Sequence, residues 1–261
     1  MLKISSEDAI NIIDDTYKNY HLRKSGVLYD KDFETNGMTK DCYIPCVGFN
    51  SPIIVIHPRG HDYNSKVTYV PVSRNMTNKD YINSEYRNTF GFQIYVWWNL
   101  HVNEGIEYYI FDDWQPETAK YGLTLWNEKG EIIYHSDWYR LKLLGVHQLG
   151  RAGPSISNDL KIDISKFSNL SNKVGILMPF VRRCMMGGLP GQYLPPAGGH
   201  NTFNNYELGE GFFFKDKNTI QYSWVCLSGI DGWWFSWDQI ITPPSSFILT
   251  VDLDGMPLNY N

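Results

Sequence analysis

Residues 121–145 read YGLTLWNEKGEIIYHSDWYRLKLLG, a stretch that predicts a β-hairpin followed by an aromatic tail. Its first arm, residues 121–126, alternates between two faces with the period of two that a pleated strand requires. Asn127 favours the first position of a turn, and Gly130 can take the positive φ that closes a type I turn with a bulge. Residues 131–136 then form the return strand. The stretch therefore indicates antiparallel β structure and contains no catalytic device.

The composition favours a folded, β-rich chain. With 261 residues, the chain is long enough for one large β domain or two ordinary ones, and it needs no disulfide or metal to fold. Hydrophobic residues make up 43% and charged residues 20%, which argues against both disorder and a membrane protein. Aromatic residues reach 15%, a level that fits half-buried strands and contact surfaces better than long helices.

The net charge and the cysteines limit which partners and which cellular compartment we expect for this chain. The net charge is −5 and no basic run occurs, so we expect no nucleic-acid partner. No run approaches ~18 apolar residues, so we expect no membrane span, and the N-terminus lacks the apolar core of a secretion signal. Cys42, Cys46, Cys184 and Cys226 are then interpreted as reduced thiols in a protein made in the cytoplasm.

Strand candidates recur at the spacing of a sandwich. They are residues 47–49 leading into 53–56, then 67–72, 90–100, 107–111, 141–146, 174–180, 220–227 and 247–253. The predicted fold is an all-β antiparallel β-sandwich with long loops, built either as one domain or as two packed β subdomains. The domain hypothesis places a β domain at 1–150 and a β-rich C-terminal part at 151–261.

The N-terminal segment supports two predictions. Ile10, Ile13, Tyr17 and Tyr20 recur at helical spacing after a possible N-cap at residues 6–8. The competing reading places strands at residues 10–13 and 19–23 with a turn between them. Periodicity alone favours the helix.

Two segments of the C-terminal half are candidate contact regions. Residues 185–200 read MMGGLPGQYLPPAGGH, which predicts a long loop of the kind that contacts partners, and Tyr193 is its candidate contact residue. Residues 231–237 read DGWWFSW, so a strand there would put Trp233 and Trp237 on one face and Trp234 on the other. Core packing on both faces and a ligand or partner surface explain this cluster equally well.

No catalytic, cofactor-binding or metal-binding residue is predicted. The His57–Asp62 loop offers two histidines but no third ligand, and the Cys42–Cys46 spacing lacks a matching pair elsewhere. The Asp112-Asp113 pair and residues 252–255 are best interpreted as turn residues, because neither completes a calcium loop or an identifiable carboxylate pair. The common hydrolase, nucleotide and metalloprotease motifs do not occur.

The opening hairpin resembles a unit of bacteriophage tail proteins in the tail-tip and tail-fibre-like group. The matching residues are Tyr121, Gly122, Leu123, Leu125, Trp126, Asn127, Gly130, Ile132, Ile133, Tyr134 and Ser136. Residues 13–20, IDDTYKNY, followed by Leu22 and Gly26, are similar to the opening of the same proteins. The resemblance covers roughly the first 145 residues and does not extend to the aromatic cluster or the Gly/Pro loop.

The resemblance implies a β-rich virion structural protein with no inherited catalytic residues, and it favours strands over the helix at the N-terminus. The resulting hypothesis is a tail tip, fibre or adaptor protein that is made in the host cytoplasm and resides in the virion. It would dock on other virion tail proteins, form oligomers and contact a host surface glycan or receptor, without a cofactor. The alternative is a carbohydrate-binding module or part of a glycan depolymerase, acting through Trp233, Trp234, Trp237 and Tyr193.

Overall fold

The protein is an all-β chain whose sheets are antiparallel. The computed structural model describes residues 19–36, 39–60, 66–74, 89–97, 101–118, 120–149, 161–167, 170–187, 203–232 and 246–261. These residues form strands β1–β16 and two short 3-10 turns, η1 (Asp30–Asp32) and η5 (Ser165–Phe167), and they contain no α-helix. The predicted fold class, an antiparallel β-sandwich, is confirmed.

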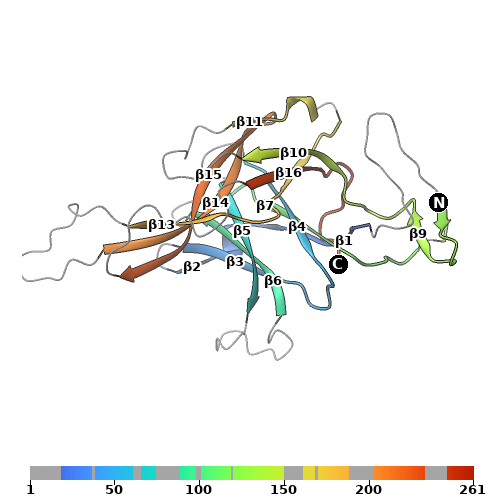
Figure 1. Cartoon of the computed structure of the whole chain (residues 1–261), viewed down its shortest axis with the longest axis horizontal. Coiled ribbons are helices and arrows are strands. Elements are labelled where there is room, and N and C mark those ends of the chain that lie inside the picture. The colour runs from blue at the N-terminus through green and yellow to red at the C-terminus, as the bar shows by residue number, and fades with distance from the viewer. Residues whose placement is uncertain are drawn as a thin grey trace, which may run out of the picture.

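The first layer is a six-stranded sheet (Figure 1). Its strands, in spatial order, are β1 (His21–Leu28), β7 (Ile106–Asp112), β4 (Ile53–Pro58), β12 (Val174–Leu177), β16 (Ser246–Asp252) and β10 (Leu143–Leu149). β12 and β4 read as nearly continuous apolar sequence, as expected of strands that are covered on both faces.

The second layer is an eight-stranded sheet. In order it contains β11 (Lys161–Asp163), β15 (Thr219–Gly232), β14 (Phe203–Asp216), β5 (Val67–Arg74), β6 (Thr89–Trp97), β3 (Thr39–Pro45) and β2 (Glu34–Asn36), and β13 (Arg183–Gly187) also pairs with β14. Strands from before and after residue 150 share both sheets, so the two halves of the chain contribute to one sandwich.

The main core lies between the two sheets. β6 shows how it forms: Phe92, Ile94 and Val96 alternate along the strand and are all buried. The alternation predicted for residues 90–100 is therefore correct over the described part of the strand, although Phe90 remains partly exposed at its start. Burial of each such side chain contributes about 1.5–3 kcal/mol to folding.

A second, smaller core covers the outer face of the six-stranded sheet. Tyr109, Phe111 and Val251 point to this side and pack with Met256 from the C-terminal tail. The tail is held along β1, where the backbone N–H of Ser25 donates to the carbonyl of Tyr260 at 2.9 Å. The six-stranded sheet is thus buried on both faces near its β1 edge.

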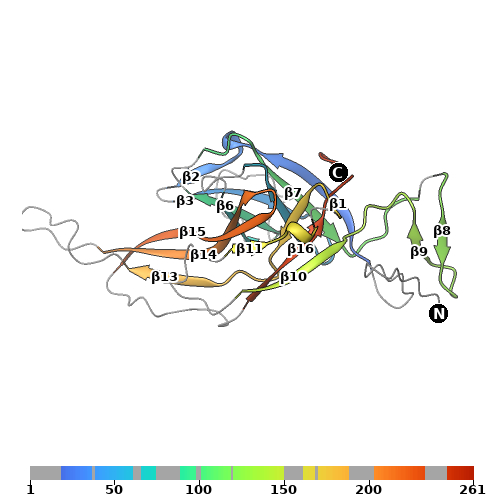
Figure 2. The same cartoon turned by 90° about the horizontal axis from the view of Figure 1, so that it is seen from above.

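The opening hairpin forms a separate sheet. β8 (Thr124–Trp126) and β9 (Ile132–His135) pair only with each other in the described chain, and Figure 2 shows them standing apart from the two layers. The predicted turn is confirmed, because Gly130 has φ 80° and its N–H donates to the carbonyl of Asn127 at 3.0 Å.

Several elements differ from the sequence prediction. The predicted loop at 185–200 is wrong over its first three residues, because β13 extends through Gly187 and finds a backbone partner in β14. The strand expected at 174–180 ends at Leu177. The strand expected at 19–23 is present in part as β1, which begins at His21 and continues to Leu28. The helix-or-strand question at residues 6–18 lies outside the described residues.

Candidate functional site

A pocket lies where the hairpin meets the edge of the sandwich, and we call it the hairpin pocket. Its volume is about 410 Å³, within the range of small-molecule sites. The lining residues are Asn19, His21, Asn50, Asp113, Trp114, Gln115, Asn127, Glu131, Ile132, Ile133 and Trp138. They come from the start of β1, the segments before β4 and after β7, and β9 with its flanking turns. The site therefore exists only because distant segments converge.

His21 is the most deeply buried polar group of the hairpin pocket, with 4% of its surface exposed. Its Nδ1 lies 2.9 Å from the carbonyl of Trp114, so this nitrogen carries the proton and donates. Burial lowers the pKa of His21 to about 4, against the smaller opposing effect of the bond to Trp114. At neutral pH the ring is neutral, and its Nε2 is an acceptor.

Two indoles also line the pocket. The ring of Trp138 meets His21 edge to face at a centroid distance of 4.8 Å, and its Nε1 donates to the carbonyl of Glu117 at 3.2 Å. The guanidinium of Arg23 lies over the Trp114 ring, 5.0 Å from the ring centroid. The aromatic groups are thus held in place by contacts with the sandwich and with the segment that leads to the hairpin.

The hairpin side of the pocket is ordered by its turn. The side-chain Oδ1 of Asn127 accepts from the backbone N–H groups of Lys129 and Glu131, at 3.0 and 2.9 Å. The Nδ2 of Asn127 donates to the Glu131 carboxylate at 2.6 Å. These bonds fix Asn127 and Glu131, both of which line the pocket, without help from the sandwich.

The first arm predicted at residues 121–126 is a strand only over β8, Thr124–Trp126, and large apolar side chains are exposed both on β8 and just before it. Tyr121, Leu123 and Trp126 are 77%, 60% and 59% exposed, and we call them the hairpin apolar surface. Scattered exposed hydrophobic residues are normal on proteins, but these three fall within six residues of one projecting element. Such a concentration is typical of a contact surface.

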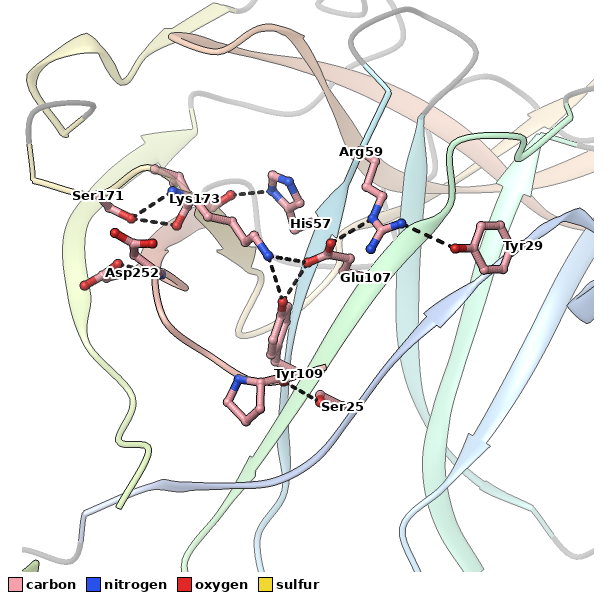
Figure 3. A network of polar contacts seen from close by, with 12 residues as sticks. Ser25, Tyr29, His57, Arg59, Glu107, Tyr109, Ser171, Lys173 and Asp252 are labelled. Carbon is pink, nitrogen blue, oxygen red and sulfur yellow. Dashed lines mark hydrogen bonds and ion pairs between the residues drawn. The ribbon is translucent and has the colours of Figure 1, made fainter. Parts of the chain in front are cut away.

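A second polar cluster surrounds Glu107 on β7. Figure 3 shows its carboxylate between Arg59 and Lys173, at 2.7 and 3.1 Å, with the Tyr109 hydroxyl donating at 2.6 Å. Burial raises the pKa of Glu107, but the bonds from these three partners outweigh it and the net shift is downward. Arg59, Lys173 and Tyr109 all bond the Glu107 carboxylate. The cluster therefore connects the end of β4 and β7 with the segment before β12. We interpret it as structural.

Asp112, one of the two adjacent aspartates, also has a structural role. Its buried carboxylate accepts from the backbone N–H groups of Asn50 and Ser51, at 2.9 and 2.7 Å, and pairs with Arg23. Residues 252–255 form a turn as predicted, in which Asp254 N–H donates to Asp252 and Gly255 has φ 72°. Asp112 is not a turn residue as predicted, because it ends β7 and holds the loop before β4 through these bonds.

The thiol and metal predictions can be compared with the described part of the chain. Cys42, Cys46 and Cys226 are free thiols, as predicted, and burial raises the pKa of Cys42 and of Cys46 to about 12. The described residues contain no cluster of three or more His, Cys, Asp or Glu side chains that could hold a metal ion. No helix in the described part of the chain has the length and apolar character needed to cross a membrane.

The four predicted contact residues, Tyr193, Trp233, Trp234 and Trp237, lie outside the described residues. The strand ends that lead into their segments are neighbours, because Phe203 at the start of β14 pairs with Gly232 at the end of β15. Gly187, at the end of β13, pairs with Asn205. Both segments are therefore attached at the same end of the eight-stranded sheet.

Sequence reasoning did not identify His21, Trp114 and Trp138 as site residues. Trp138 belongs to the aromatic tail of the opening stretch and Trp114 precedes that stretch closely, but His21 is 93 residues away from Trp114 in the sequence. Only the pairing of β1 with β7 places His21 beside Trp114. No local pattern signals that contact.

Comparison with known proteins provides no relative from which a role could be transferred. No protein-family model, no curated protein and no solved structure matches this chain.

Proposed function

We propose that this protein is a bacteriophage virion structural protein associated with the tail, as a tip, fibre or adaptor component. It acts by docking on other virion proteins and carries out no chemistry of its own. One observation carries the proposal: the hairpin that resembles tail proteins projects from the sandwich and bears the hairpin apolar surface.

A hairpin of this kind gains stability from a partner. A two-stranded hairpin is only marginally stable alone, and here β8 and β9 pair only with each other in the described chain. Large aromatic side chains on a projecting element are the usual anchors of protein interfaces. The free strand edges can also add to a sheet of a partner. Docking would bury Trp126 and its neighbours and pair the backbone N–H and C=O groups along those edges.

Mass spectrometry of purified virions tests the assignment directly. We expect the chain to be present at several copies in particles of the phage that encodes it, because tail components of this kind are oligomeric. Its absence from purified particles, while abundant in the infected-cell lysate, contradicts the proposal.

Substitutions on the hairpin test the docking surface. Trp126→Ser is expected to lower incorporation into particles about tenfold or more, since truncating an interface anchor costs about 2 kcal/mol. Val47→Ser is the matched control, because Val47 is 51% exposed in the turn between β3 and β4, outside the hairpin. Equal incorporation of the Trp126→Ser variant and the wild-type chain would rule out docking through this surface.

The alternative function, glycan binding through Trp234 and Trp237, stays a prediction because both residues lie outside the described chain. It expects Trp234→Ala or Trp237→Ala to abolish glycan binding by the whole protein. Unchanged binding on a glycan array would remove this alternative.

A further inference from the structure

One long edge of the sandwich has a free side. β10 (Leu143–Leu149) is the last strand of the six-stranded sheet, and Figure 2 shows it at the border of the sandwich beside β16. Among the described strands it pairs with β16 alone. An edge strand directs every second pair of backbone N–H and C=O groups away from its sheet, so β10 offers these groups to another strand.

The other ends of the two sheets are protected in ways that β10 is not. β1 is covered by the chain itself, because the Ser25 N–H donates to the carbonyl of Tyr260 at 2.9 Å. β2 and β11, at the two ends of the eight-stranded sheet, are three residues long and contain charged side chains. β10 has seven residues, LLGVHQL, without an aspartate, glutamate, lysine, arginine or proline. Natural edge strands use such residues to prevent pairing, so β10 favours strand addition.

Apolar side chains lie beside this edge on the outer face of the six-stranded sheet. Leu143 and Val146 are 54% and 66% exposed. Val146 is paired with Leu249 of β16, which packs against the smaller core on that face. Phe247, also on β16, meets the partly exposed ring of Phe180 edge to face at a centroid distance of 5.7 Å. A strand added to β10 would cover the exposed valine and extend this apolar surface.

The charges indicate which strand fits β10. The whole chain carries a net charge of −5, so two copies repel each other over most orientations. Along β10 that repulsion is absent, because burial lowers the pKa of His147 and its ring is neutral at pH 7. Lys142, just before the strand, is paired with Asp252 at 3.5 Å. A second β10 can therefore lie antiparallel to the first without like charges opposite each other.

We propose that two copies of this protein pair through β10. The strands run antiparallel about a two-fold axis close to Val146, the central residue of β10, and join the two six-stranded sheets into one continuous sheet. The axis is perpendicular to the sheet, so both outer faces lie on the same side and the two Val146 side chains are neighbours. This interface is separate from the hairpin and does not depend on the virion assignment.

Sedimentation velocity of the full-length chain at pH 7 tests the pairing. We expect wild-type monomer and dimer to interconvert between about 1 and 100 µM, with no larger species, because a two-fold interface is closed. Val146→Lys should raise the dissociation constant of the dimer at least about tenfold, because the axis places two ammonium groups side by side. Val146 is exposed, so the substitution should leave the fold intact, which circular dichroism checks.

Val146→Glu provides a rescue. Alone, it should dimerise as weakly as Val146→Lys, because two carboxylates then meet at the axis. An equimolar mixture of the two variants should recover a heterodimer, since a lysine then faces a glutamate. This pattern requires an interface in which residue 146 meets its own copy. Val47→Lys, which changes another exposed valine in the turn between β3 and β4, is the matched control and should keep the wild-type affinity.

Several outcomes would overturn the proposal. One is a wild-type chain that stays monomeric over the whole concentration range, and another is association that continues beyond the dimer. A third is a mixture of Val146→Lys and Val146→Glu that associates no better than either variant alone. Finally, Trp126→Ser should retain the dimer, and its loss in that variant would move the contact between copies to the hairpin. A monomeric chain that still enters particles would leave the virion assignment intact, with β10 then open to a different protein.

Discussion

At the scale of single residues, His21 connects separate parts of the molecule. It lies on β1, meets Trp138 edge to face and bonds Trp114, so it links the sandwich to the segment preceding the hairpin. Burial keeps its ring neutral, and that neutrality makes Nε2 an acceptor. The same burial makes the residue a source of pH-dependent stability.

The pKa of His21 predicts a loss of stability in acid. Its pKa is about 4 in the folded protein and 6.5 ordinarily, so between these values only the unfolded chain binds the proton. Lowering the pH from 7 to 4 should therefore reduce the free energy of unfolding by about 3 kcal/mol through this residue. Urea unfolding of the wild type and His21→Asn at both pH values measures this contribution.

In that comparison His21→Asn is the control for all other titrating groups. Its amide nitrogen can replace Nδ1 as donor to the Trp114 carbonyl, but it does not titrate. The variant should lose about 3 kcal/mol less than the wild type over the same pH interval. Equal losses would mean that burial does not lower the pKa of His21.

At the scale of elements, the hairpin is the part that local sequence specifies best. Its turn requires a positive φ at Gly130, and the amide of Asn127 caps the turn through bonds to nearby residues only. For this reason the hairpin could be predicted from the sequence. In contrast, β3 was not predicted, because its pairing depends on a distant strand, β6. β14 was not predicted either, although it forms a hairpin with the next strand, β15.

Gly130→Ala is predicted to loosen the hairpin without unfolding the sandwich. A residue with a Cβ pays about 1–2 kcal/mol at the left-handed φ of this position. Because β8 and β9 pair only with each other among the described strands, that cost should remain local. Hydrogen exchange should accelerate at the amides of β8 and β9, while the thermal midpoint of the sandwich stays unchanged.

Gly130→Asn is the matched substitution, since asparagine tolerates the left-handed region better than alanine. It should retain more of the hydrogen-exchange protection. If Gly130→Ala instead lowers the thermal midpoint of the whole protein, the prediction is wrong. The hairpin would then unfold together with the sandwich, although it forms a separate sheet.

At the scale of the whole molecule, a buried ion pair lies in the core between the sheets. Arg182 and Glu210 are each 2% exposed, and Arg182 Nε donates to the Glu210 carboxylate at 2.5 Å. Tyr222 adds a bond from its hydroxyl at 2.7 Å. The neighbours of Glu210 on the same side of β14, Leu208 and Phe212, belong to the main core. The pair is therefore shielded from water.

Breaking this pair is predicted to destabilise the whole sandwich. Glu210→Gln leaves Arg182 as a buried charge without its counterion and should lower the free energy of unfolding by about 3–5 kcal/mol. The double variant Arg182→Met, Glu210→Leu should recover most of that loss, because it removes both charges from the core. Urea unfolding of Glu210→Gln and of the double variant measures this, and a double variant no more stable than Glu210→Gln would contradict the prediction.

The sequence by itself determined the features that arise from neighbouring residues. These include the all-β class, from alternating apolar positions such as Phe92, Ile94 and Val96, and the hairpin turn, from Asn127 and Gly130. Free thiols at Cys42 and Cys46 also followed from the sequence. Such features need only the covalent spacing of the chain and the side-chain types.

Tertiary structure alone decided where function can reside. Strand pairing brought His21 to Trp114, the aromatic tail added Trp138, and the loop before β4 added Asn50, so the hairpin pocket joins segments far apart in the sequence. The same assembly left the hairpin outside both sheets. Contacts between distant residues are chosen by the packing of the whole chain, and a local sequence pattern carries no record of that choice.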